Sequence, residues 1–177
     1  RYNLDHRLGS WIKSGCGKKD PSMRVVYIHG SVGVGKTISA IRVANRAVMD
    51  GLVTSFLFVR EADLINAAKQ MYGPDADIHN RTLERARKVK LLLVDEMFAR
   101  PDAYTDHVSH VVGDLFAQRF EKKLPGLFTS NEPPMWGSVF DQRVRSRFDL
   151  VSWCERIVSK DMRKTDSKRI HEEESVA

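Results

Sequence analysis

A glycine-rich segment that ends in a lysine and a hydroxyl residue is the part of the sequence best suited to chemistry. It reads GSVGVGKT over residues 30–37 and matches the pattern G-x-x-x-x-G-K-[ST] of a phosphate-binding loop. Glycines let successive backbone N–H groups turn inward, and a helix that follows adds positive potential. Lys36 would neutralise the β- and γ-phosphates of a nucleotide, and the Thr37 hydroxyl would ligate Mg²⁺. The predicted nucleotide-binding residues are Gly30, Ser31, Val32, Gly33, Val34, Gly35, Lys36, Thr37 and Ile38.

Two adjacent acids follow an apolar run later in the chain. The run is LLLV at 91–94, and Asp95 and Glu96 come directly after it. This order places both carboxylates at the C-terminal end of a buried strand, the edge at which α/β sheets bind ligands. Asp95 would hold Mg²⁺ through water, and Glu96 would polarise the water that attacks the γ-phosphate. Strands that end in solvated acids are common, so the pair gains its significance from the phosphate loop upstream.

Strands and helices alternate along the segment that must position these groups. Short apolar runs predict five strands, at 24–29, 55–59, 91–94, 127–130 and 150–153. Apolar residues at helical spacing predict helices at 36–51, 64–71, 83–89, 108–120 and 139–147. This alternation predicts an α/β fold: a three-layer, parallel, five-stranded sheet with helices on both faces.

The composition is that of a globular domain. Of 177 residues, 42% are hydrophobic and 29% are charged, which argues against disorder and fibrous repeats. No apolar stretch approaches the length of a membrane span, so we expect no membrane partner. Lys and Arg outnumber Asp and Glu by 29 to 23, which suits a polyanionic partner or simply a soluble surface. Cys16 and Cys154 form neither a disulfide framework nor a metal spacing, so we expect a reducing, cytoplasmic compartment and no zinc.

Four motifs, in their order along the chain, resemble those of an AAA+ ATPase, and most closely the DnaC/DnaI/IstB-type helicase-loader branch. They are GSVGVGKT, LLLVDE at 91–96, LFTSN at 127–131 and RVRSRF at 143–148. The resemblance implies an AAA+ ATPase core over residues 22–164. Residues 1–21 would lie near the nucleotide base, with Leu4, Trp11 and Ile12 as apolar surface for it, unless this segment is a helix packed on the core. Residues 165–177 are expected to form a disordered polar tail.

The resemblance also implies roles for single residues. Asn131, at the tip of the strand next to the acid-bearing one, would orient the attacking water or touch the γ-phosphate; a carboxamide can both donate and accept. Arg147, with Arg143 as the competing candidate, would reach into a neighbouring subunit's site and stabilise the transferring phosphoryl group. Arg163 is the candidate for a second sensor arginine. Only 27 residues follow Leu150, too few for a full C-terminal lid domain, which loaders of this branch tend to lack.

Basic residues gather in two stretches that suit nucleic acid. One holds Arg81, Arg85, Arg87, Lys88 and Lys90, with Lys69 and Tyr72 before it; the other holds Arg119, Lys122 and Lys123. Basic groups with an occasional aromatic suit single-stranded binding, in which charge supplies affinity and rings stack on bases. A solvated helix face explains such runs equally well. The candidate DNA contacts are Lys69, Tyr72, Arg81 and Arg85.

The expected function is ATP-dependent loading of a hexameric replicative helicase onto single-stranded DNA, with Mg²⁺-dependent hydrolysis of ATP at the interfaces of an ATP-dependent oligomer. An IstB-like transposition regulator, which would assemble on duplex DNA with a transposase, has the same motifs. A viral superfamily 3 helicase shares the TSN motif. However, Asp95 follows Lys36 by 59 positions, a longer separation than those compact helicases usually allow. A P-loop metabolite kinase and a non-hydrolysing scaffold are further alternatives. Because the chain begins at Arg1, we expect it to be part of a longer protein.

Overall fold

A five-stranded parallel sheet forms the centre of the protein. The computed structural model describes residues 2–157, with side chains from residue 8 onward. The strands are β1 (Val25–Gly30), β2 (Phe56–Arg60), β3 (Leu91–Asp95), β4 (Gly126–Ser130) and β5 (Ser152–Ile157). Their order is β2-β3-β4-β1-β5, and every neighbouring pair is parallel. The predicted α/β class and the parallel five-stranded sheet are therefore confirmed.

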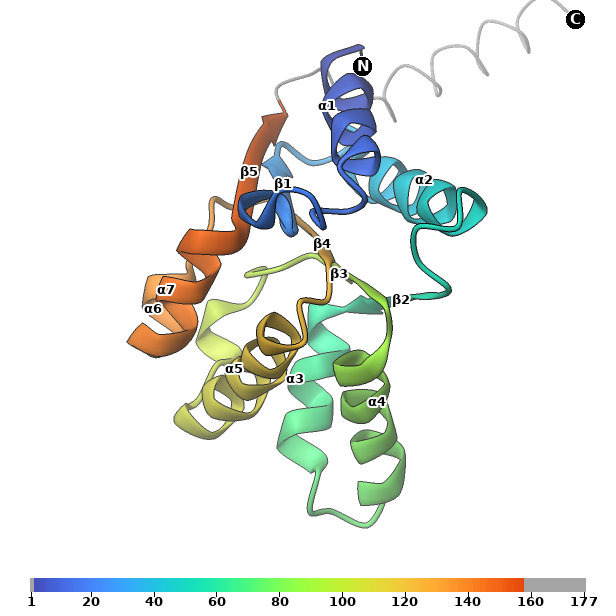
Figure 1. Ribbon diagram of the computed structural model, residues 1–177. Helices are drawn as coiled ribbons and strands as arrows, with labels where there is room; N and C mark the ends of the chain where they lie inside the picture. Colours follow the sequence, from blue (N-terminus) through green and yellow to red (C-terminus); the bar gives the residue numbers. More distant parts are fainter. Residues whose placement is uncertain (1, 158–177) are drawn as a thin grey trace, which may run out of the picture.

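Helices cover both faces of this sheet (Figure 1). One face carries α1 (Tyr2–Lys13) and α2 (Lys36–Met49); the other carries α3 (Glu61–Gln70), α4 (Ala76–Lys88), α5 (Asp106–Glu121), α6 (Trp136–Val139) and α7 (Gln142–Val151). Two short 3₁₀ turns lie at Pro21–Met23 and Pro101–Ala103. Alternate residues of β1 belong to the two apolar cores: Val26 and Ile28 pack with α1 and α2, and Tyr27 packs with the opposite layer. Among residues 2–157, no helix combines the length and apolarity that crossing a bilayer requires.

The predicted helix at 139–147 and strand at 150–153 are wrong in their bounds. The first helical segment, α6, ends at Val139 because the backbone of Phe140 is extended. Asp141 then caps a new helix by accepting a hydrogen bond from the Val144 N–H at 2.9 Å. The new helix, α7, continues through Leu150 and Val151, so β5 begins only at Ser152.

Aromatic side chains fix these last helices to the sheet. Trp136 stacks on Phe148 with ring centroids 4.2 Å apart and meets Tyr27 edge-on at 4.9 Å. Such contacts stabilise a core beyond the area that they bury. Trp136 is thus a packing residue.

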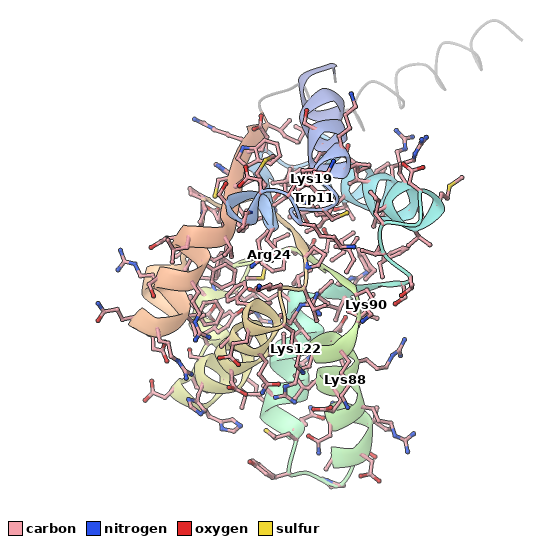
Figure 2. All side chains as sticks on the ribbon, in the orientation of Figure 1. Trp11, Lys19, Arg24, Lys88, Lys90 and Lys122 are labelled. Carbon is pink, nitrogen blue, oxygen red and sulfur yellow. The ribbon has the colours of Figure 1, made fainter. Side chains whose placement is uncertain are left out.

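The side chains of α1 pack inward. Leu8 and Trp11 are fully buried, and the Trp11 indole donates to the Met23 carbonyl at 2.7 Å (Figure 2). Ile12 is partly buried against the same core, and the Leu4 side chain lies outside the described ones. Trp11 therefore offers no free surface to a base, whereas the placement of residues 1–21 near a nucleotide base stays a prediction.

Candidate functional site

The glycine-rich loop joins β1 to the N-terminus of α2. Gly33 and Gly35 have φ angles of 79° and 88°, in the left-handed region that favours glycine. Gly30 has φ 145°, and a Cβ atom there would lie 2.1 Å from the carbonyl oxygen of Ile157 in β5. The loop can follow this path beside β5 only because glycine stands at these positions.

Lys36 lies at the mouth of the loop and is 8% exposed. Its Nζ donates to the carbonyl oxygens of Gly30 and Ser31 and to Oδ1 of Asn131, each at 2.8 Å. The fold thus brings together two predicted residues that lie far apart in the sequence. Phosphate oxygens that approach Lys36 would take the place of these neutral acceptors, and a charged acceptor makes the stronger hydrogen bond.

Asp95 is held between two hydroxyls. Thr37 Oγ1 donates to Asp95 Oδ1 at 2.7 Å, and Thr129 Oγ1 donates to the same oxygen. A hydroxyl and a carboxylate in contact are hard oxygen donors, and Mg²⁺ commonly uses one or two protein oxygens together with water and phosphate. The donor set of Thr37 and Asp95 therefore fits Mg²⁺.

Thr129 is a site residue that sequence reasoning missed. It belongs to the TSN segment, in which only the asparagine received a role, and its hydroxyl also accepts from the Glu96 N–H at 3.4 Å. The next residue, Ser130, donates to the Met97 carbonyl and accepts from the Glu132 N–H at 2.9 Å. The only sequence signal for these contacts was the position of both hydroxyls at the end of a buried strand.

Glu96 lies in the turn that follows β3, with a φ angle of 61°. The Met97 N–H donates to the Thr129 carbonyl at 2.8 Å, so the turn is fastened to β4. The Glu96 side chain is exposed and lines the same cavity as the phosphate loop.

One cavity of about 220 Å³ collects these groups. Its lining consists of Val32, Gly33, Gly35, Lys36, Thr37, Ile38, Asp95, Glu96, Thr129, Ser130 and Asn131. Of the other predicted loop residues, Gly30 and Ser31 contribute the carbonyls that hold Lys36, while Val34 is buried. The structure therefore places the phosphate loop, both acids and Asn131 around one space; their roles in catalysis stay predictions.

The electrostatics of the loop favour an anion. Burial lowers the pKa of His29, and the nearby cations Arg156 and Lys36 lower it further. Positive groups that oppose a further proton also attract phosphate, and α2 adds the positive end of its dipole.

The arginines of α7 lie apart from this cavity. Arg147 is half-buried, and its Nη1 lies 3.1 Å from Glu121 Oε1 on α5. Arg143 is exposed, with no ion pair to the described part of the chain. Neither arginine lines the cavity. Arg163 lies outside the described residues.

The four candidate DNA contacts are all exposed. Lys69 is exposed, and Tyr72 is 82% exposed with its ring 6.1 Å from that of His107 on α5. Arg81 and Arg85 are exposed on α4 and line a groove beside β2. Arg85 also lines a second groove together with Gln70, at the end of α3. Contact of these residues with DNA stays a prediction.

In the second basic stretch, Arg119 is buried and is not available to nucleic acid. Arg119 is 2% exposed and donates to the carbonyls of Ala86, Val89 and Pro125 at 2.7–2.9 Å. Burial lowers the pKa of Arg119 to about 10. The expectation that Arg119 contributes to a nucleic-acid surface is wrong, because its guanidinium joins the end of α4 to the start of β4. Lys122 remains exposed.

The strand order and the site together define a class of protein. The phosphate loop follows β1, Asp95 ends β3 with Glu96 directly after it, and β4, which Asn131 follows, lies between β1 and β3. A parallel sheet of this order with a phosphate loop at its carboxyl edge is that of an AAA+ P-loop ATPase, which binds ATP. A family model described as IstB-like ATP binding protein matches residues 18–163. The chain belongs to that family.

Several known proteins are similar to this chain. The chromosomal replication initiator protein DnaA of Campylobacter fetus subsp. fetus (strain 82-40) is 28% identical over 134 residues, which cover 70% of this chain and 27% of DnaA. This chain thus matches only about a quarter of that relative's length. The crystal structure of DnaI has a TM-score of 0.70 at 22% identity and covers 88% of this chain and 86% of its own. The DnaC helicase loader has a TM-score of 0.65 at 17% identity, with coverages of 89% and 92%. These structural likenesses establish the fold.

Proposed function

We propose that this protein hydrolyses ATP with Mg²⁺ in an oligomer and uses the cycle to load a hexameric replicative helicase onto single-stranded DNA. One observation carries the proposal: a single cavity is lined by the phosphate loop, by Asp95 and Glu96, and by Asn131, which is hydrogen-bonded to Lys36. The loading role draws support from the likeness to DnaI and to the DnaC helicase loader.

Each contact of the cavity suits one part of phosphoryl transfer. Lys36 would exchange its neutral acceptors for the β- and γ-phosphates, and Thr37 with Asp95 would hold Mg²⁺. The bound metal ion neutralises charge on the phosphates. Glu96 accepts a proton from the attacking water. Asn131, next to Lys36, contacts the γ-phosphate and distinguishes ATP from ADP.

A neighbouring subunit completes the site. Neither Arg143 nor Arg147 lines the cavity of its own chain, so an arginine of α7 acts on the site of another copy. Arg147 must first leave Glu121, to which it is paired at 3.1 Å, whereas Arg143 is already exposed. Hydrolysis therefore depends on assembly.

Single-stranded DNA is the proposed polyanionic partner. Arg81 and Arg85 lie one helical turn apart on α4, both exposed, and Lys88 lines the same groove. Charges in such a row bind a phosphate backbone without regard to sequence. Lys69 and Tyr72 form a second contact at the end of α3, where the exposed ring can stack on a base.

A second candidate function comes from the family itself. An IstB-like member would assemble with a transposase on duplex DNA, and the match to that family model over residues 18–163 favours this alternative. The same cavity and the same trans-acting arginine would serve both functions, so the partner decides between them.

The test compares ATP turnover by the unaltered protein alone, with single-stranded DNA and a replicative helicase, and with duplex DNA and a transposase. Stimulation by the first pair, with transfer of the helicase onto DNA, is expected; stimulation by the second pair alone would assign the transposition role. Glu96→Gln should keep ATP binding and stop turnover, while the matched change Asp102→Asn at an exposed acid should leave both unchanged. Turnover by Glu96→Gln near that of the unaltered protein would overturn the assignment of the base.

The DNA contacts have a matched control on the opposite face of the sheet. Arg81→Ala with Arg85→Ala should weaken binding of single-stranded DNA and reduce its salt dependence. Arg42→Ala with Arg46→Ala removes the same charge at the same spacing from α2 and should not. Equal losses from both pairs would indicate a net-charge effect and contradict a specific contact on α4.

A further inference from the structure

A buried carboxylate lies beneath the turn that carries Glu96. Glu61, the first residue of α3, is 2% exposed. Its Oε1 accepts from the Phe98 N–H at 2.7 Å and from the Tyr104 hydroxyl at 2.7 Å, and the Ala99 N–H also reaches the carboxylate. Burial raises the pKa of Glu61, while these three hydrogen bonds oppose the rise. A charge is seldom buried at such a cost unless it holds other groups in place.

The groups that Glu61 holds belong to a strained turn. Glu96 and Phe98 have φ angles of 61° and 60°, which cost free energy for residues other than glycine. Such angles persist only where the surroundings fix them. The backbone of residues 96–99 therefore needs external contacts to keep its shape.

Every N–H group of this turn has an acceptor. Those of Glu96 and Met97 donate to Thr129, through its hydroxyl oxygen at 3.4 Å and its carbonyl at 2.8 Å. The Ala99 N–H donates to the Glu96 carbonyl at 3.1 Å. The Phe98 N–H donates to Glu61. β4 thus holds one half of the turn, and α3 holds the other half through a single side chain.

We propose that Glu61 is a positioning residue for Glu96: its carboxylate fixes Phe98 and thereby the left-handed turn that directs Glu96 into the nucleotide cavity. The inference rests on the proposed ATPase function, because its effect is felt by the base of that reaction. Phe98 is 1% exposed, so loss of Glu61 leaves a buried N–H without an acceptor. The turn would then relax toward ordinary φ angles and carry Glu96 away from the attacking water.

A series of substitutions at Glu61 separates position from charge. Glu61→Gln keeps an acceptor oxygen at the same reach and should retain turnover within about threefold of the unaltered protein. Glu61→Asp keeps the charge but shortens the side chain by one methylene, and kcat should fall roughly 10-fold. Glu61→Ala removes the carboxylate, and kcat should fall roughly 100-fold. Both losses lie within the range found when a catalytic group is misplaced. The affinity for ATP should stay within twofold in all three, because no atom of Glu61 lines the cavity.

A double substitution separates a positioning role of Glu61 from a general loss of stability. Glu96→Gln leaves at most a slow residual hydrolysis, which single-turnover measurement with excess protein can follow. In that background Glu61→Asp should not lower the residual rate further, because the group that it positions has already lost its function. The control Asp63→Asn, at an exposed acid of the same helix turn, should change nothing. Turnover is measured well below the melting temperature of each variant.

The outcomes distinguish failure of the proposed ATPase function from failure of the proposed positioning role of Glu61. If the unaltered protein binds ATP without turning it over, the proposed function fails. If it turns ATP over and a folded Glu61→Asp variant keeps its kcat, the positioning role is overturned, and an additive loss in the Glu96→Gln background overturns it too. Should Glu61→Ala not fold, the Gln and Asp variants still decide the matter.

Discussion

The contact between Lys36 and Asn131 allows a direct electrostatic test of the cavity. Asn131 Oδ1 lies 2.8 Å from the Lys36 ammonium, and a phosphate bound to Lys36 would lie at a similar distance on its other side. Asn131→Asp would therefore place a second negative charge within about 5.6 Å of the γ-phosphate, counting one ammonium hydrogen bond on each side. The ammonium would gain a charged partner in the empty protein and the triphosphate would meet a repulsive one.

The expected magnitude follows from Coulomb's law. At an effective dielectric constant of about 20, two unit charges about 5.6 Å apart repel by roughly 3 kcal/mol, or about 100-fold in affinity. ADP lacks the phosphate nearest Asn131, so its affinity should fall less. The empty protein should melt at a higher temperature, because the Lys36 ammonium gains a charged partner in place of a neutral one. Asn131→Ala is the matched control: it removes the acceptor without adding charge, and should lower turnover more than binding.

Calorimetric titration of ATP and ADP, with thermal melts of the empty proteins, measures all three quantities. Equal loss of ATP and ADP affinity would show that Asn131 does not lie near the γ-phosphate. Unchanged ATP affinity in Asn131→Asp would refute the placement of the triphosphate at Lys36.

Four other substitutions test separate parts of the site. Lys36→Ala should reduce ATP affinity below detection in the same titration, and retained binding would refute the phosphate-loop assignment. Arg147→Ala protein and Arg143→Ala protein are each mixed with Glu96→Gln protein, and turnover should recover only in the mixture that contains the variant of the trans-acting arginine. Loss of the ion pair between Arg147 and Glu121 should itself lower the free energy of unfolding by no more than about 1 kcal/mol. The folded protein lowers the pKa of His29, so the unfolded chain binds a proton at this residue more readily than the folded protein does. The free energy of unfolding should therefore fall as the pH drops below about 6.5, the pKa of His29 in the unfolded chain. His29→Asn should flatten that decline in urea titrations at several pH values, and an unchanged slope would contradict it.

Local sequence patterns predicted most of the fold because the signals for strands, helices and their ends agreed with one another. The run LLLV is buried on both faces, as β3 is, and the pattern from Lys36 to Met49 ends where Asp50 and Gly51 stop α2. Apolar runs without polar alternation are what a parallel sheet covered on both faces requires. The resemblance placed Asn131 at the tip of the strand next to the acid-bearing one, and β4, which ends just before Asn131, does pair with β3.

The sequence failed where one distant contact overrides a local pattern. Arg119 stands among lysines and reads as surface, yet three carbonyls from α4, its end and the start of β4 take its guanidinium inside. Glu61 reads as an ordinary acid in the first turn of a helix, where acids are common. Its actual partners, Phe98 and Tyr104, follow 37 and 43 residues later. The residues next to Arg119 and Glu61 in the sequence therefore do not predict the role of either side chain.

The central place of β4 gives the site a physical link between nucleotide and base. Its end contacts both halves of the cavity: Asn131 accepts from Lys36 on the side of β1, and Thr129 holds Asp95 and the Glu96 N–H on the side of β3. Thr129 belongs to β4, which is buried along its whole length, and Asn131 directly follows the end of that strand. A closely packed strand does not deform continuously. On the proposed function, a shift of Asn131 on loss of the γ-phosphate would therefore move the contacts of Thr129 as well, and Glu61, which holds Phe98 in the same turn, would determine whether that movement reaches Glu96.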